Sequence, residues 1–253
     1  MAEVNIIDVT ADNVSETGFY CIKDTKSPGY FKKLDWVRSE INRGLQIKIA
    51  TDGKGKQLGF IEFIPSEFAW RPIKANNYLF IQCIAILFRE SRNKGIGSAL
   101  IRTCELEAEE NNKNGICTIV SDGAWMANKS IFLKYGFTPG DRLERFELLY
   151  KKQKEGGAVP QFINWIMQQK SYKGWNLIYA DQCPWHEKSV KDIHQCAMDH
   201  GIALNVRRLN TPEEAQNGPS GYGTYTLIKD GKLLADHYIS RTRFENIIRN
   251  DLN

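Results

Sequence analysis

A glycine-containing turn at residues 92–98, Arg-Asn-Lys-Gly-Ile-Gly-Ser, offers the clearest chemistry in the chain. Gly95 and Gly97 carry no side chains that would keep a ligand away from the backbone. A helical pattern follows at once, and the first amides of a helix have no partner within it. These amides point at an anion, and the helix dipole adds to the attraction. The turn therefore predicts a binding site for phosphate groups.

Two common phosphate-binding loops do not fit this turn. A dinucleotide-binding loop needs a third glycine, or an alanine, where this chain has Leu100. A P-loop needs Gly-Lys-Ser or Gly-Lys-Thr after a longer glycine loop, and the turn lacks that sequence. What remains is the pattern Arg92-x-x-Gly95-x-Gly97 between a strand and a helix.

The elements around the turn are predicted from their apolar patterns. Residues 78–88 form an apolar run, broken only by Gln82, that is typical of a buried central strand. After the turn, five residues recur at helical spacing to form one apolar face: Ile96, Ala99, Leu100, Cys104 and Ala108. A strand at 116–121 follows, and then a second helix that ends at Tyr135-Gly136-Phe137.

These features together resemble the GNAT acetyltransferases. The Arg-x-x-Gly-x-Gly turn resembles the acyl-CoA pyrophosphate loop of that family, and the helix ending at Gly136-Phe137 resembles its second signature. The order helix, hairpin, strand, glycine turn, helix, strand, helix, strand matches as well, over residues 1–150. The resemblance implies an α/β (α+β) fold with a mixed sheet and flanking helices.

The resemblance also implies acetyl-CoA as the cosubstrate. It places the pyrophosphate on the backbone amides of Asn93, Lys94, Gly95, Ile96, Gly97 and Ser98, with Arg92 nearby. The backbone near Ile86 and Leu87 would pair with the pantetheine arm and polarise the thioester, and Asn128 is a further contact.

Proton transfer is less clear from the sequence. Glu62 is the best candidate for a general base, because a carboxylate among Phe and Ile residues is where a raised pKa would arise. The alternation of the strand equally allows Glu62 to lie on a solvated face, and Glu67 in the next loop is a weaker candidate. Many GNAT enzymes carry a tyrosine acid where this chain has Phe132, which leaves Tyr135 as the nearby hydroxyl.

Three aromatic residues, Phe68, Trp70 and Trp125, are candidates to line an acceptor pocket, although aromatic residues near strand ends more often belong to the core. The acceptor itself is expected to be a small-molecule amine.

A charge run followed by two glycines, at residues 151–157, is the best domain boundary. It predicts a domain at 1–152, a linker at about 153–157 and a second domain at 158–253. The second domain reads as strand, helix, strand, helix, β-hairpin and helix, an order that resembles the thioredoxin fold. A GNAT domain with such an extension resembles a group of bacterial GNAT proteins.

Cys183-Pro184-Trp185-His186 falls where the thioredoxin fold carries its redox motif. A helix N-terminus stabilises a thiolate, so Cys183 is a candidate reactive group. His186 replaces the resolving cysteine, which excludes a disulfide cycle within the motif, and Gly223-Thr224 stand where that fold usually carries a cis-proline. A monothiol role, a metal contact or a relic all remain open.

No metal site is expected. Cys183 and His186 are separated by a predicted helix from Cys196 and His200, or by ~15 Å of helix rise, which is too far for one zinc ion.

Composition limits the class of protein. The 253 residues carry a formal charge of +4 and six scattered cysteines. The sequence has no basic block for nucleic acid, no apolar stretch long enough to span a membrane, no signal peptide and no disulfide framework. We therefore expect a cytoplasmic, acetyl-CoA-dependent N-acetyltransferase that uses direct transfer, as a monomer or a homodimer. The alternative is an acyl-CoA-binding or redox-linked protein in which Cys183 reacts.

Overall fold

The chain divides into two compact units in the computed structural model, which describes residues 4–19, 21–22 and 24–252. Unit 1 comprises Met1–Lys23, Val37–Ala69 and Ile73–Phe162. Unit 2 comprises Asp24–Trp36, Trp70–Pro72 and Ile163–Asn253. This division differs from the predicted one, because the change falls after Phe162 and two short segments from the first half of the chain belong to unit 2.

Unit 1 contains fourteen consecutive elements, apart from α2. They are β1 (Val4–Val9), α1 (Val14–Thr17), β2 (Gln46–Asp52), β3 (Gln57–Pro65), η1 (Ser66–Phe68), β4 (Ile73–Lys74), β5 (Tyr78–Ile86), η2 (Arg89–Ser91), α3 (Ile96–Glu110), β6 (Gly115–Val120), α4 (Lys129–Lys134), β7 (Thr138–Leu143), β8 (Phe146–Lys152) and β9 (Gln161–Phe162). Helix α2 (Pro28–Ile41) begins in unit 2 and ends in unit 1.

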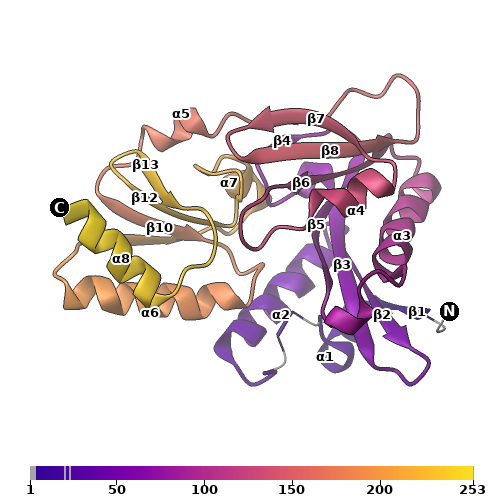
Figure 1. Ribbon diagram of the computed structural model, residues 1–253, viewed down its shortest axis with the longest axis horizontal. Coiled ribbons are helices and arrows are strands. Elements are labelled where there is room, and N and C mark those ends of the chain that lie inside the picture. The colour runs from indigo at the N-terminus through magenta and orange to yellow at the C-terminus, as the bar shows by residue number, and fades with distance from the viewer. Residues whose placement is uncertain (1–3, 20, 23, 253) are drawn as a thin grey trace. The chain divides into compact units, whose positions relative to one another are not determined.

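The main sheet of unit 1 has the strand order β1-β2-β3-β5-β6-β8-β7 (Figure 1). Strands β5 and β6 pair in parallel, and the other neighbours pair antiparallel. The parallel pair requires a crossover, which α3 supplies. The prediction of an α/β fold with a large mixed sheet and flanking helices is confirmed.

Helix α3 packs its apolar face against one face of this sheet. Ile96, Leu100 and Cys104 lie in one buried cluster with Ile61 of β3 and Ile81 of β5. Ile101, which the sequence pattern did not include, is also fully buried in the cluster, whereas Ala99 is only partly buried. The buried face of α3 is therefore the predicted one, except that it includes Ile101 and is centred slightly closer to that residue than to Ala99.

Unit 2 is built on a smaller sheet with the order β11-β10-β12-β13. Its elements are α5 (Ile166–Gln169), β10 (Trp175–Tyr179), α6 (Trp185–Asp199), β11 (Leu204–Arg208), α7 (Pro212–Gln216), β12 (Tyr225–Lys229), β13 (Lys232–Ala235) and α8 (Arg241–Leu252). Strand β10 pairs in parallel with β11 and antiparallel with β12, and β12 and β13 form a hairpin.

The two short segments from the first half of the chain pack closely in unit 2. A Cβ atom on Gly29 would lie 2.0 Å from the carbonyl oxygen of Pro184, so the start of α2 touches the turn that precedes α6. A Cβ atom on Gly223 would lie 2.5 Å from the carbonyl oxygen of Trp70. Gly223 also has a φ of 74°, which favours glycine. Both contacts need glycine at these positions.

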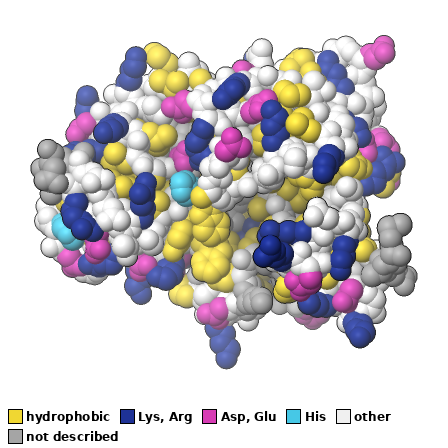
Figure 2. Space-filling model, in the orientation of Figure 1, with side chains coloured by type: hydrophobic (Ala, Val, Ile, Leu, Met, Phe, Trp, Pro, Cys, Tyr) yellow, Lys and Arg dark blue, Asp and Glu magenta, His cyan; other side chains and the backbone are white. Residues whose placement is uncertain are grey.

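Charged residues are spread over the protein. On the face in view in Figure 2, Lys and Arg side chains are interspersed with Asp and Glu. Among the described residues, no helix has both the length and the apolar character needed to cross a membrane.

Candidate functional site

The parallel strands β5 and β6 separate before they end. Their pairing runs from Tyr78 and Gly115 to Ile81 and Thr118, whereas β5 continues to Ile86. The Thr118 hydroxyl donates to the carbonyl oxygen of Ile81, with an oxygen–oxygen distance of 3.0 Å, where the paired region stops. Beyond that point, no strand among the described residues pairs with the edge of β5 that faced β6.

The backbone of Ile86 faces this open edge. The Leu87 amide donates to the carbonyl oxygen of Leu58 at 3.2 Å, on the β3 side. Gly59 and Ile86 are therefore a pair without mutual hydrogen bonds, and the N–H and C=O of Ile86 point away from β3. Of the two residues that the resemblance selects, Ile86 offers its amide to a ligand and Leu87 has its amide engaged.

The predicted phosphate turn lies directly before α3. Gly95 is the N-cap residue, with a φ of 81° and no capping side chain, and Asn93 has a φ of 61°. The first hydrogen bond of the helix runs from the Ala99 amide to the Gly95 carbonyl oxygen at 2.9 Å. Among the described residues, the backbone amides from 93 to 98 have no acceptor. They are available to an anion in the field of a fifteen-residue helix.

The two glycines of the turn have different roles. A Cβ atom on Gly95 would meet nothing within 4 Å, so its surroundings are open to a ligand. A Cβ atom on Gly97 would lie 2.4 Å from Cδ1 of Ile131 in α4. Gly97 therefore also allows α3 to pack closely against α4, in addition to its predicted place in the phosphate turn.

Asn128 precedes α4, the helix whose Ile131 meets Gly97. The Asn128 side chain caps α4 by accepting a hydrogen bond from the Ser130 amide at 2.8 Å. Arg92, Lys94 and Ser98 are exposed. Two cationic side chains therefore stand beside the free amides.

Glu62 is completely buried, with 0% of its surface exposed, so the solvated alternative is wrong. It lies in the middle of β3, opposite Cys83 of β5, where the register of the two strands shifts. Ile61 and Phe63 face α3, so strand alternation places Glu62 on the other face of the sheet. Phe60, two residues earlier on the same face, is buried as well.

Tyr135 is held in an ionic cluster. Its hydroxyl donates to Oε2 of Glu105 at 3.1 Å, and Glu105 also receives Lys151 at 2.5 Å and Arg102 at 2.7 Å. Burial raises the pKa of Tyr135 to about 12, and the neighbouring Glu105 carboxylate adds to the shift. Burial alone would raise the pKa of Glu105, but the bonds from Lys151 and Arg102 lower it. The Tyr135 hydroxyl is thus committed to a buried carboxylate, and Phe132 is fully buried in the core.

The other candidates in unit 1 lie in loops. Glu67 accepts a hydrogen bond from the Asn77 amide at 2.7 Å, which orders the loop between β3 and β5. Phe68 is exposed, and Trp125, in the loop after β6, is 50% exposed. Trp70 is buried in unit 2, where its ring packs edge-on against Trp36. Trp70 is therefore a core residue, and Trp125 remains a candidate for acceptor contact.

The side chain of Arg145, from the turn between β7 and β8, reaches the residue that follows β6 and was not predicted as a site residue. Its Nη1 donates to the Ser121 hydroxyl at 2.6 Å, and its guanidinium lies 4.3 Å from the centre of the Phe146 ring. The guanidinium lies over Gly123, where a Cβ atom would displace it. Ser121 directly follows β6 and Ile86 is the last residue of β5, and parallel strands end at the same edge of a sheet. The pairing of β6 with β8 brings Arg145 close to Ser121, although the two residues are distant in sequence.

Cys183 lies in the turn before α6. It is partly buried, and its carbonyl oxygen accepts the His186 amide at 3.0 Å. Cys196 is buried, its Sγ lies 3.8 Å from Nδ1 of His200, and burial raises the pKa of its thiol. Within the described residues, no group of three or more His, Cys, Asp and Glu side chains is placed to hold a metal ion.

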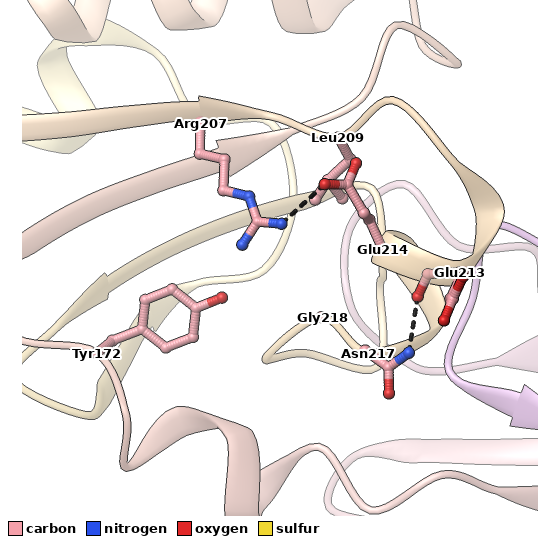
Figure 3. A pocket seen from close by; sticks show the side chains of 7 residues that line it. All are labelled: Tyr172, Arg207, Leu209, Glu213, Glu214, Asn217 and Gly218. Carbon is pink, nitrogen blue, oxygen red and sulfur yellow. Dashed lines mark hydrogen bonds and ion pairs between the residues drawn. The ribbon is translucent and has the colours of Figure 1, made fainter.

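A cavity of about 220 Å³ opens in unit 2 beside α7 (Figure 3). Arg207 and Tyr172 line one side, and Arg207 forms an ion pair with Glu214 at 2.9 Å. Asn217 donates to the Glu213 carbonyl oxygen at 2.9 Å. The charges of Arg207 and Glu214 neutralise each other.

One curated protein and several solved structures are similar to this chain. No protein-family model matches the chain. An uncharacterised N-acetyltransferase, YoaP of Bacillus subtilis (strain 168), is 26% identical over 248 residues, which are 96% of this chain and 97% of the relative. A GNAT-family acetyltransferase structure from Staphylococcus aureus Mu50 is 19% identical, with a TM-score of 0.41, over 60% of this chain and 100% of its own. The PaiA N-acetyltransferase of Thermoplasma acidophilum, solved with coenzyme A, is 16% identical, with a TM-score of 0.44, over 59% and 99%. Over almost its whole length, the chain is similar to a protein named as an N-acetyltransferase.

Proposed function

We propose that unit 1 transfers an acetyl group from acetyl-CoA directly to the amine of a small molecule. The observation that carries this proposal is the row of unpartnered amides at residues 93–98 beside the separating ends of β5 and β6. The similarity to an N-acetyltransferase over 96% of the chain supports it. We also infer a cytoplasmic enzyme, because its six cysteines are free thiols, as is usual in a reducing compartment.

The residues fit acetyl-CoA in three places. The free amides at 93–98 bind the pyrophosphate, and Arg92 and Lys94 add positive charge. The open edge of β5 pairs with the pantetheine arm. The outward N–H of Ile86 donates to the thioester oxygen as negative charge develops on it, which is oxyanion-type stabilisation.

Acetyl-CoA supplies the acetyl group as a thioester, and the chain supplies the proton transfers. Glu62 acts as the base that takes the proton from the attacking amine, because it is the buried carboxylate in the middle of the sheet. The C–N bond forms as the C–S bond breaks, and the thiol departs as a thiolate. Tyr135 already donates to Glu105, so we infer that the thiolate leaves without a side-chain acid.

We further propose that unit 2 is a thioredoxin-like domain. Its strand order, its single parallel pair and the helices α6, α7 and α8 support this assignment. Cys183 at the start of α6 then occupies the reactive position of that fold, which is the basis of the alternative function.

The test is a screen of small amines with acetyl-CoA that reads the release of free thiol. We expect at least one amine to raise thiol release above the slow hydrolysis of acetyl-CoA, with a matching acetylated product by mass spectrometry. Binding of acetyl-CoA is measured separately by calorimetry. If acetyl-CoA does not bind to the folded chain, the proposal fails.

Two matched substitutions separate the proposal from the alternative. Glu62→Gln should lower kcat on the best amine by about 10²–10⁴-fold and leave the affinity for acetyl-CoA unchanged. Cys183→Ser should leave both unchanged. Loss of activity in Cys183→Ser, with activity kept in Glu62→Gln, would favour the thiol-dependent alternative.

A further inference from the structure

Unit 2 contains a buried cluster of polar groups that the proposed acetyl transfer does not use. Arg71 is 6% exposed and His186 is 0% exposed. Thr224 and Tyr222, in the loop before β12, are buried with them. Arg71 belongs to unit 2 through the short segment Trp70–Pro72. The cluster therefore joins three parts of the chain inside one compact unit.

Hydrogen bonds hold Arg71 and His186 near each other. Nη1 of Arg71 donates to the Thr224 hydroxyl at 2.9 Å, and the Thr224 carbonyl oxygen accepts the Ala180 amide at 2.9 Å. The carbonyl oxygen of Ala180 in turn lies 2.8 Å from Nδ1 of His186. Arg71 and His186 are thus hydrogen-bonded to Thr224 and Ala180, and the backbones of these two residues are hydrogen-bonded to each other. The Tyr222 ring lies beside both, 4.3 Å from the Arg71 guanidinium carbon and 6.4 Å from the His186 ring centre.

Within the described residues, one buried ring nitrogen of His186 lacks a hydrogen-bond partner, and Arg71 lacks a counter-charge. Among the described residues, no carboxylate forms an ion pair with Arg71. The contacts of Arg71 are one neutral hydroxyl and the face of the Tyr222 ring. A guanidinium has five N–H donors, and a buried cation without a counter-charge is costly. Because Nδ1 of His186 donates to Ala180, its Nε2 is a bare acceptor, and this buried atom has no hydrogen-bond partner among the described residues.

We propose that Arg71, His186 and Thr224 form a binding site in unit 2 for the carboxylate group of a small ligand. A planar carboxylate matches the fork of the guanidinium and supplies the missing negative charge. The same carboxylate also gives His186 a partner, because a protonated Nε2 donates a hydrogen bond to a carboxylate oxygen. Binding is therefore accompanied by the uptake of one proton at His186.

The charges around His186 explain this proton uptake. Burial lowers the pKa of His186 to about 4, the bond to Ala180 opposes the shift, and the cations Arg71 and Lys33 add to it. The other ionisable groups beside the ring are the phenols of Tyr222 and Tyr225, which are neutral at pH 7. A bound carboxylate offsets the two cations and raises the pKa of the imidazole.

Nuclear magnetic resonance of the full chain, labelled with nitrogen-15, tests the site with sodium acetate as the probe. At pH 6.5 and constant ionic strength, we expect the Nε2 signal of His186 to move saturably toward that of an imidazolium. Acetamide, which has the same shape and no charge, should leave the signal in place. No response to acetate up to 100 mM, or an equal response to sodium chloride, would overturn the proposal. A response to inorganic phosphate alone would overturn the carboxylate assignment.

Two matched variants identify the side chain responsible. Arg71→Lys keeps the charge and loses the fork, and should weaken acetate binding at least tenfold. Arg207→Lys, at an exposed ion pair, should leave it unchanged. If Arg71→Lys does not fold, His186→Asn keeps a donor for Ala180 and is read by the rise in Tm that acetate produces. The same rise in His186→Asn and the wild type would contradict the role of His186. These readouts do not depend on acetyl transfer.

Discussion

Gly97 of α3 lies against Cδ1 of Ile131 in α4, so closely that a single added methyl group would stand 2.4 Å from it. Gly97 is therefore a packing residue as well as part of the turn, whereas a Cβ atom on Gly95 would meet nothing within 4 Å. This distinction separates effects on stability from effects on binding.

Gly97→Ala should lower the free energy of unfolding by about 1–3 kcal/mol, because the new Cβ overpacks the contact with Ile131. Ile131→Val removes Cδ1, the atom that the new Cβ would meet. In the Ile131→Val background, Gly97→Ala should therefore cost clearly less. Urea unfolding of the four proteins of this cycle measures the coupling, and simple additivity would show that the two residues do not compete for space.

Gly95→Ala should weaken acetyl-CoA binding about tenfold and cost about 1–2 kcal/mol of stability, because its φ of 81° is unfavourable for alanine. Gly55 is the control, since it has a φ of 78° and nothing within 4 Å of an added Cβ. Gly55→Ala should lose similar stability and keep full affinity. Calorimetric titration with acetyl-CoA compares them, and equal affinities would argue against the amide cradle.

Tyr135→Phe removes the hydroxyl that donates to Glu105. Because Lys151 and Arg102 still neutralise this carboxylate, we expect a loss of only about 1 kcal/mol of stability. The value of kcat should change less than twofold, since the thiolate leaves without this acid. A fall of a hundredfold or more in kcat, with the fold intact, would instead make Tyr135 the general acid.

The stability of unit 2 should fall as the pH is lowered below 6.5. His186 has an ordinary pKa of 6.5 and a pKa of about 4 in the folded chain. Between these values the unfolded chain binds a proton that the folded chain does not, so stability decreases as pH falls through this window. The loss is on the order of 3 kcal/mol and is complete near pH 4.

Thermal unfolding between pH 4 and 7 checks this dependence. His186→Asn should flatten it, since asparagine keeps a donor for Ala180 and does not titrate. His194→Asn, at an exposed position of α6, controls for the loss of an imidazole. An unchanged slope in His186→Asn would place the titrating group elsewhere.

The sequence predicted the local elements well, because their patterns are local. The Arg92–Ser98 turn was recognised from its glycines and from the apolar residues on both sides. The role of Gly97 was not, since Ile131 is distant in sequence. The contact of Arg145 with Ser121 was not predicted for the same reason, because it depends on the pairing of β8 with β6. The burial of Glu62 was undecided, since alternation along a strand does not tell which faces of a sheet are covered.

The sequence patterns also did not predict which segments of the chain make up unit 2. Residues 151–157 have the charges and glycines of a linker, and nothing in Trp70–Pro72 marks that segment as part of another unit. Its assignment depends on the close approach of Trp70 to Gly223 and on the bond from Arg71 to Thr224.

The chain passes between the two units at 23/24, 36/37, 69/70, 72/73 and 162/163. A protease that cuts at residues 153–157 therefore severs one of several covalent ties and releases no complete second unit. A gene fragment that starts at residue 158 likewise encodes the smaller sheet but lacks residues 24–36 and 70–72, which belong to the same unit and pack against its turns. Neither unit can therefore be produced from one continuous segment of the chain, although each has its own sheet.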